Sequence, residues 1–141
     1  MDDFKLKIID DIAIIVVDIP VATHRDVKPL WDELESKTIL DWDKIIIDLS
    51  FCTYVDSTFV GLIVKIYKRI CEKNGQLKLV FPETKAMIHF HTIGITRMVD
   101  CFNDLNQAVK SFDTKIPTRK IVFDEEIANQ WSIEPKKIKL V

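Results

Sequence analysis

A short apolar run followed by a long amphipathic pattern is the feature that most constrains how this chain folds. Residues 44–49 read Lys-Ile-Ile-Ile-Asp-Leu, which is too short for a helix and too apolar to face water on both sides. From residue 59 the apolar residues recur on one helix face, at Phe59, Leu62, Ile63, Ile66 and Ile70. Asn74 and Gly75 then supply a helix stop. The pattern predicts a buried central strand followed by a helix.

The junction between this strand and this helix reads Asp56-Ser57-Thr58. All three side chains are suited to capping a helix N-terminus, so a cap is the simplest interpretation. The rotation of about 100° per residue along a helix allows a second interpretation of these residues. With Phe59 at the centre of the buried face, the outward stripe holds Ser57, Gly61, Val64 and Lys68, with Val60 partly outward. Ser57 is then an exposed hydroxyl at a helix start, where a phosphate would meet unpaired N–H groups and add a charge of about −2. That charge would repel an acidic or apolar partner surface, which is the chemistry of a switch.

Strand and helix patterns alternate along most of the chain. Residues 4–9 and 12–19 read as strands of a hairpin that turns at Asp10-Asp11, and Thr23 is a candidate cap for a helix through Leu30 and Leu34. The later pattern is a strand at 76–81, a helix at 85–93 closed by Gly94, an edge strand at 98–102 and a helix at 104–112. This alternation predicts an open α/β sheet with helices packed against it.

A longer motif carries a resemblance to a known family. Residues 48–62 read D-L-S-x-x-x-Y-V-D-S-T-x-x-G-L, and a Lys-rich helix, the strand at 76–81 and Ile93-Gly94-Ile95 follow. This arrangement resembles the STAS domain, and it is most similar to the small bacterial anti-sigma factor antagonists. The resemblance implies a STAS-like fold, with an open mixed sheet of about four to five strands and helices packed mainly on one face. Residues 1–112 would form the domain, with residues 113–141 as a C-terminal extension.

The resemblance also implies a function. The hydroxyl that is phosphorylated in the family falls on Ser57. The bare form would sequester an anti-sigma factor that is itself a serine kinase, and would so free a sigma factor. The kinase would transfer phosphate from ATP to Ser57 and let go, and a PP2C-type phosphatase would restore the bare form. The residues expected to bind the partner are Asp56, Thr58, Val60, Gly61, Val64, Lys65 and Lys68.

Two of these residues have expected roles within the site. Asp56 would position the loop and orient the Ser57 hydroxyl, while Thr58 would cap the helix or make a neighbouring contact. The chain departs from the family at two places: Phe59 replaces a usual glycine, and residues 18–23 replace a G-x-L-D type stretch that contributes to the partner surface. A constitutive STAS scaffold, or an interaction module in another signalling assembly, therefore remains an alternative.

An enzyme is not expected. A nucleophilic Ser57 would need a base within hydrogen-bond reach and a third orienting group, and the adjacent Asp56 does not meet that need. The chain has no G-x-S-x-G elbow, and its three glycines leave no phosphate-binding loop. We predict no catalytic residue and no cofactor.

Composition limits the partners and the compartment. The 141 residues are 48% apolar and 30% charged, which suits one soluble domain. A formal net charge of −2 gives no reason to expect nucleic acid or a membrane surface as a partner. No apolar run approaches the ~20 residues of a membrane span, and the first residues lack a signal-peptide pattern. We expect a cytoplasmic protein.

The cysteines, the histidines and the extension complete the pattern. Three cysteines without C-x-x-C spacing argue against disulfides and zinc, and the spacing of His24, His89 and His91 argues against any metal site. In the extension, residues 119–123 suit a strand, and Ile127 and Trp131 suit a short helix. We expect residues 113–141 to pack on the domain, with a homodimer or partner contact through them as the alternative.

Overall fold

The computed structural model describes residues 3–82 and 94–112, which form an α/β sandwich around a mixed sheet. Within these residues the sheet has five strands in the order β1-β2-β4-β6-β7, of which only the β1–β2 pair is antiparallel. The strands are β1 (Phe4–Ile9), β2 (Ile12–Val17), β4 (Lys44–Asp48), β6 (Gln76–Val80) and β7 (Asp100–Phe102). The predicted open mixed sheet, with its central strand at 44–49, is confirmed.

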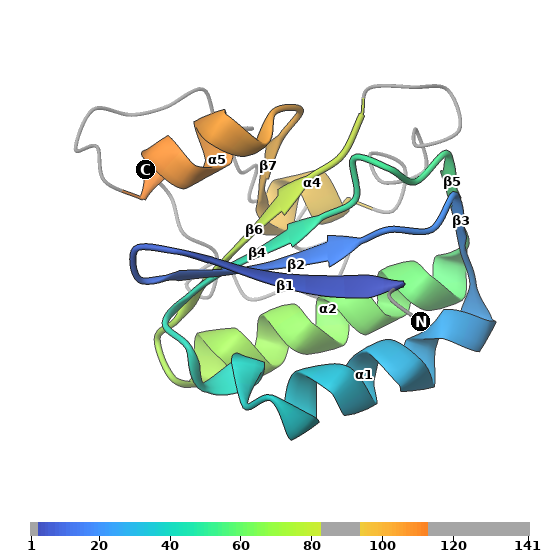
Figure 1. Ribbon diagram of the computed structural model, residues 1–141, viewed down its shortest axis with the longest axis horizontal. Helices are drawn as coiled ribbons and strands as arrows, with labels where there is room; N and C mark the ends of the chain where they lie inside the picture. Colours follow the sequence, from blue (N-terminus) through green and yellow to red (C-terminus); the bar gives the residue numbers. More distant parts are fainter. Residues whose placement is uncertain (1–2, 83–93, 113–141) are drawn as a thin grey trace.

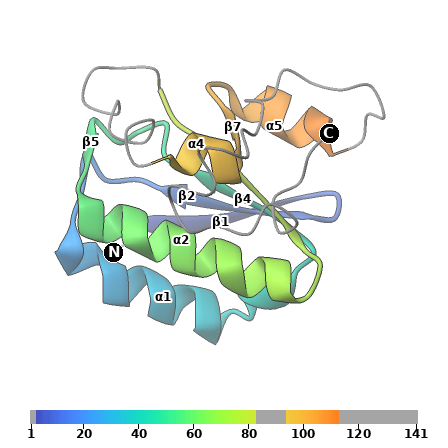
Figure 2. The ribbon, with the colours of Figure 1, turned by 180° about the vertical axis from the view of Figure 1, so that it is seen from behind.

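Two helices cover one face of this sheet, as Figures 1 and 2 show from opposite sides. They are α1 (Val27–Ser36) and α2 (Ser57–Glu72), which lie side by side under the strands. The apolar stripe of α2 is buried as predicted, and it packs with Leu30 and Leu34 of α1 against the sheet. Asn74 ends this helix in a left-handed conformation with φ 63°, as its place beside Gly75 suggested.

The opposite face of the sheet carries a smaller helix, α5 (Leu105–Ser111), so helices lie mainly on one face as expected. α5 packs on β4, β6 and β7 and covers a second apolar cluster. Within that cluster the side chain of Lys78 is only 3% exposed. Its ammonium group lies 3.4 Å from an Asp100 carboxylate oxygen and 4.5 Å from the centre of the Phe112 ring.

The structure adds short elements that the sequence pattern did not predict. They are β3 (Val21–Ala22), β5 (Tyr54–Val55), α4 (Ile95–Met98) and the 3₁₀ turns η1 (His24–Asp26) and η2 (Ile39–Asp41). Thr23 was predicted to cap the helix through Leu30 and Leu34, but it caps η1, the 3₁₀ turn that leads into α1. Met98 ends α4 and does not belong to the edge strand.

Several expectations lie outside the described residues. They are the helix at 85–93 with His89 and His91, and the extension at 113–141 with its strand at 119–123 and its helix at Ile127 and Trp131. Within the described part of the chain, no helix is both long and apolar enough to cross a membrane.

Candidate functional site

A two-stranded parallel sheet, formed by β3 and β5, brings the junction before α2 next to a turn far away in sequence. Val21 pairs with Tyr54, and Ala22 pairs with Val55. The N–H of Asp56 donates to the Ala22 carbonyl oxygen at 3.0 Å, which extends the pairing by one residue. Asp56, which follows β5, therefore lies beside Thr23, which follows β3. This places Asp56 next to the start of the Thr23–Asp26 turn.

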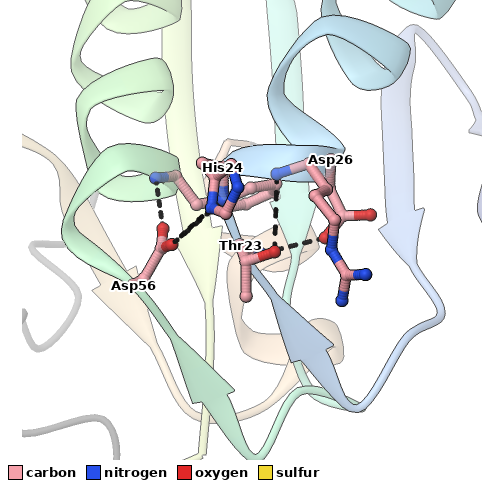
Figure 3. A network of polar contacts seen from close by, with 6 residues as sticks. Thr23, His24, Asp26 and Asp56 are labelled. Atoms are coloured by element: carbon pink, nitrogen blue, oxygen red, sulfur yellow. Dashed lines mark hydrogen bonds and ion pairs between the residues drawn. The ribbon is translucent and has the colours of Figure 1, made fainter.

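Asp56 uses both carboxylate oxygens to hold backbone in place (Figure 3). Oδ1 accepts from the N–H of Phe59 at 2.8 Å, which makes Asp56 the N-cap of α2. Oδ2 accepts from the N–H of His24 at 3.0 Å, across 32 residues of sequence. Nδ1 of His24 lies 3.8 Å from the same oxygen, and the Asp56 side chain is 22% exposed. One carboxylate thus ties the start of α2 to the η1 turn.

The η1 turn is itself closed by a reciprocal capping arrangement (Figure 3). The N–H of Thr23 donates to Asp26 Oδ2 at 2.9 Å, and the N–H of Arg25 donates to Thr23 Oγ1 at 3.4 Å. The N–H of Asp26 also reaches the Thr23 carbonyl oxygen at 2.9 Å. This capping box satisfies backbone donors that a turn start otherwise leaves unpaired, so the turn is locally well defined.

Ser57 is the first residue of α2, and its side chain is exposed. In the part of the chain that the structure describes, the hydroxyls of Ser57 and Thr58 make no hydrogen bond. The expected roles therefore need two corrections. Asp56 positions the loop through bonds to the backbone N–H groups of His24 and Phe59, and its carboxylate makes no hydrogen bond with the Ser57 hydroxyl. Thr58 does not cap the helix, because Asp56 does.

The outward stripe of α2 is largely where helical periodicity places it. Gly61, Lys65 and Lys68 are exposed, and Val64 is half-buried. Val60 is only 1% exposed and belongs to the main core, so the expectation that it faces partly outward is wrong. The reason is that η1 and α1 both pack against α2, which buries a flank that an isolated helix would expose.

Lys65 has an additional partner that the sequence pattern did not indicate. Its ammonium group lies 4.1 Å from the centre of the half-buried Trp31 ring on α1. A cation over an indole face is attracted by the ring quadrupole. The pair therefore holds Lys65 in place on the outer surface of the two helices.

The charged side chains of α2 are mostly basic, and the nearest of them lies about two helical turns from Ser57. From Ser57 to Cys71 the helix α2 carries Lys65, Lys68 and Arg69 and no acidic residue, and Arg25 is exposed on the neighbouring turn. The whole chain, in contrast, has a formal net charge of −2. A phosphate on Ser57 would bring a charge of about −2 to the positive end of the α2 dipole.

Exposed apolar side chains lie on the β3–β5 sheet and in the turn before β5, and sequence reasoning missed them. Val21 is 47% exposed, Tyr54 is 46% exposed, and Phe51, in the turn before β5, is 58% exposed. Two-residue strands have no measurable periodicity, so nothing in the sequence separated these residues from core residues.

The thiols and potential metal ligands do not form a second site in the described residues. Residues 3–82 and 94–112 contain no cluster of three or more metal-ligating side chains. The three cysteines are free thiols. Burial raises the pKa of the Cys52 thiol to about 12, so it is neutral and a weak nucleophile at neutral pH.

Comparison with known proteins identifies relatives of this chain. The STAS domain family matches residues 3–108. A Thermotoga maritima protein classed as an anti-sigma factor antagonist is 28% identical over 115 residues, which are 79% of this chain and 99% of that protein.

Solved structures share the fold. An anti-sigma factor antagonist from Mycobacterium paratuberculosis is similar with a TM-score of 0.70 and 14% identity, over 79% of this chain and 93% of that one. The Bacillus cell fate determinant SpoIIAA, in its phosphorylated form, is similar with a TM-score of 0.59 and 16% identity, over 77% of this chain and 98% of that one. At such low sequence identity, these two structures are evidence for the fold alone.

Proposed function

Because the chain belongs to the STAS domain family, we propose that it is an anti-sigma factor antagonist whose binding is controlled by phosphorylation of Ser57. With Ser57 bare, the protein sequesters an anti-sigma factor that is itself a serine kinase. Phosphate transfer from ATP to Ser57 releases the kinase, and a PP2C-type phosphatase restores the binding form. The protein acts as a binding module in the cytoplasm and catalyses no step itself.

The observation that carries this proposal is the position of Ser57. Its hydroxyl is exposed on the first residue of α2, and the helix cap is provided by the neighbouring Asp56. Modification therefore removes no cap and no buried contact, so the fold can keep its stability while the surface charge changes. Relatives named anti-sigma factor antagonists, and a related fold solved in a phosphorylated form, support the same reading.

The proposed partner surface is made of exposed and half-buried residues on the outer side of α2 and at its cap. It comprises Asp56, Thr58, Gly61, Val64, Lys65 and Lys68, and Val60 is left out because it is buried. This basic stripe suits an acidic partner surface, which a phosphate on Ser57 would repel.

The test is phosphorylation of the purified full-length chain. Each serine-kinase anti-sigma factor of the source organism is incubated with the chain and ATP, and the product is analysed by intact mass and fragmentation. We expect one added phosphate on Ser57 with one of these kinases, none with Ser57→Ala, and unchanged transfer with the control Ser36→Ala, which alters an exposed serine at the end of α1. Phosphate on Thr58 alone, or on neither residue with any kinase, would contradict the proposal.

A constitutive scaffold makes a different prediction for binding. Under phosphorylation control, Ser57→Ala keeps the affinity for the kinase and Ser57→Asp weakens it. Equal affinity of the two variants would favour a STAS module in another assembly, with Ser57 as an ordinary first-turn residue.

A further inference from the structure

The first strand, β1, carries exposed apolar side chains along the edge of the main sheet. Leu6, Ile8 and Ile9 are 37%, 48% and 38% exposed, while every residue of the neighbouring β2 is buried. In the part of the chain that the structure describes, β1 pairs with β2 alone, and its other side is the edge of the sheet (Figure 1). An exposed apolar edge strand is a template for pairing with another chain.

Charged residues protect this edge only in part. Lys5 and Lys7 are exposed on β1, but Lys5 Nζ lies 2.8 Å from Asp18 Oδ2 of the same chain, so its charge is already paired. Asp10 and Asp11 follow in the exposed turn between β1 and β2. The edge therefore changes from basic to acidic along its length.

This order of charges suits an antiparallel pair of identical edges. An antiparallel arrangement reverses the direction of one strand, so the acidic turn of each copy comes to lie beside the basic half of the other. A parallel arrangement in register would instead place like charges side by side, which is unfavourable. The edge is thus complementary to itself, and the occupant that fits it is a second copy of this chain.

The alternation of side chains limits the register of such a pair. A two-fold axis keeps the even-numbered residues of both copies on one face of the joined sheet, so opposite residues have numbers with an even sum. Pairing centred on Lys5, Leu6 or Lys7 brings lysines directly opposite each other, which is destabilising. Pairing centred on Ile8 avoids this, because Lys7 then lies opposite Ile9 of the second copy. Lys5 lies beside the acidic turn of that copy.

We propose that two copies of this protein pair antiparallel through β1, in the register centred on Ile8, and join their sheets into one. The pairing adds main-chain hydrogen bonds along the edge and removes Leu6, Ile8 and Ile9 of both copies from water. The strand is already formed in each copy, so little ordering is needed on association.

This interface lies at the end of β1 that is remote from Ser57. Ile8 pairs with Ala13 near the start of β2, whereas Val17, at the other end of β2, leads toward β3 and the junction before α2. The dimer therefore leaves the Ser57 surface of each copy open. It goes beyond the proposed function and does not depend on it.

Sedimentation equilibrium of the full-length chain over a range of concentrations tests the dimer. We expect the average mass to rise toward that of two chains by about 100 µM, as for a Kd in the micromolar range. Ile8→Lys places two like charges at the axis and should weaken dimerisation about tenfold or more. The matched control is Val21→Lys, since Val21 is 47% exposed against 48% for Ile8 but lies on β3. We expect this control to dimerise like the original chain, and thermal unfolding checks that both variants are folded.

A second measurement needs no variant. Hydrogen exchange of the original chain is followed at low and at high protein concentration. We expect exchange in residues 6–9 to slow at high concentration, and exchange in β7, at the opposite edge of the sheet, to stay the same. Unchanged exchange in β1 at a concentration where the mass has risen would overturn the proposal, even where Ile8→Lys fails to fold.

The remaining outcomes are equally decisive. A chain that stays monomeric over the whole range contradicts the proposal, and so does a dimer that Ile8→Lys leaves unchanged, because the interface then lies elsewhere. Equal weakening by Ile8→Lys and Val21→Lys would show that the effect is not local to β1. None of these results bears on phosphorylation of Ser57, which its own test decides.

Discussion

Asp56 and Lys78 are charged side chains in the same small domain, and both are held by several partners, but their surroundings are opposite. Asp56 lies at the surface, 22% exposed, and ties two backbone segments beside Ser57. Lys78 lies under α5 with its side chain 3% exposed, against Asp100 and the rings of Phe102 and Phe112. The charge of the Asp56 carboxylate is tolerated because water still reaches it. The charge of the buried Lys78 ammonium group is tolerated because its partners are part of the folded structure.

This contrast explains where a switch can be placed in the fold. A phosphate beside Asp56 stays solvated and alters the surface with little strain on the core. A change of charge beside Lys78 would leave a buried group uncompensated. Under the proposed function, signalling belongs to the Asp56 region and stability to the Lys78 region, and the predictions below test this division.

The largest effect is expected from Lys78→Ala, at about 3 kcal/mol of unfolding free energy, because it removes the buried ammonium group that faces the Asp100 carboxylate. The double variant Lys78→Met with Asp100→Leu replaces the pair by apolar groups and should recover most of that loss. Denaturant unfolding measures both. A loss below about 1 kcal/mol for Lys78→Ala would show that the buried pair is not a stability element. The folded double variant should bind the kinase normally.

A smaller effect is expected from Asp56→Ala, at about 1 kcal/mol, since it removes the N-cap of α2. Asp56→Asn is the matched variant: its single amide oxygen still caps Phe59, but no second oxygen remains for the His24 N–H. Hydrogen exchange should therefore rise at His24 in both variants, and at Phe59 in Asp56→Ala alone. Unchanged hydrogen exchange at the His24 amide would mean that the hydrogen bond from this amide to Asp56 does not hold the η1 turn in place.

The smallest effect is expected at the Lys65–Trp31 pair. The cation lies 4.1 Å from the ring centre on an exposed surface, where such pairs contribute about 0.5 to 1 kcal/mol. A double-mutant cycle with Lys65→Met and Trp31→Leu measures the coupling directly. A coupling near zero would mean that Lys65 is a mobile surface cation, and it would weaken the case for a preorganised basic stripe on α2.

The elements that the sequence predicted are those with long periodic patterns. The β-branched run at 44–49 and the apolar stripe of α2 specify the central strand and the main helix, and their junction places Ser57 at an exposed helix start. Residue types along the sequence are sufficient to predict these elements, because periodicity and helix capping depend on residues only a few positions apart.

The missed features depend on contacts between distant segments. The bond between Asp56 and the His24 N–H exists only because β3 pairs with β5, and each of these strands has two residues. Val60 is buried by η1 and α1, and the periodicity of α2 alone takes no account of these neighbouring elements. Lys78 reads as an ordinary polar residue in an alternating strand, and only the packing of α5 shows that its face of the sheet is covered.

The most direct test of the account is the affinity of the partner kinase for the full-length chain with and without phosphate on Ser57. Calorimetry on the bare protein and on protein carrying phosphoserine at position 57 gives both values under the same conditions. The account predicts binding at least about tenfold weaker for the phosphorylated form, from charge repulsion at a preformed surface. Equal affinity of the two forms would contradict it.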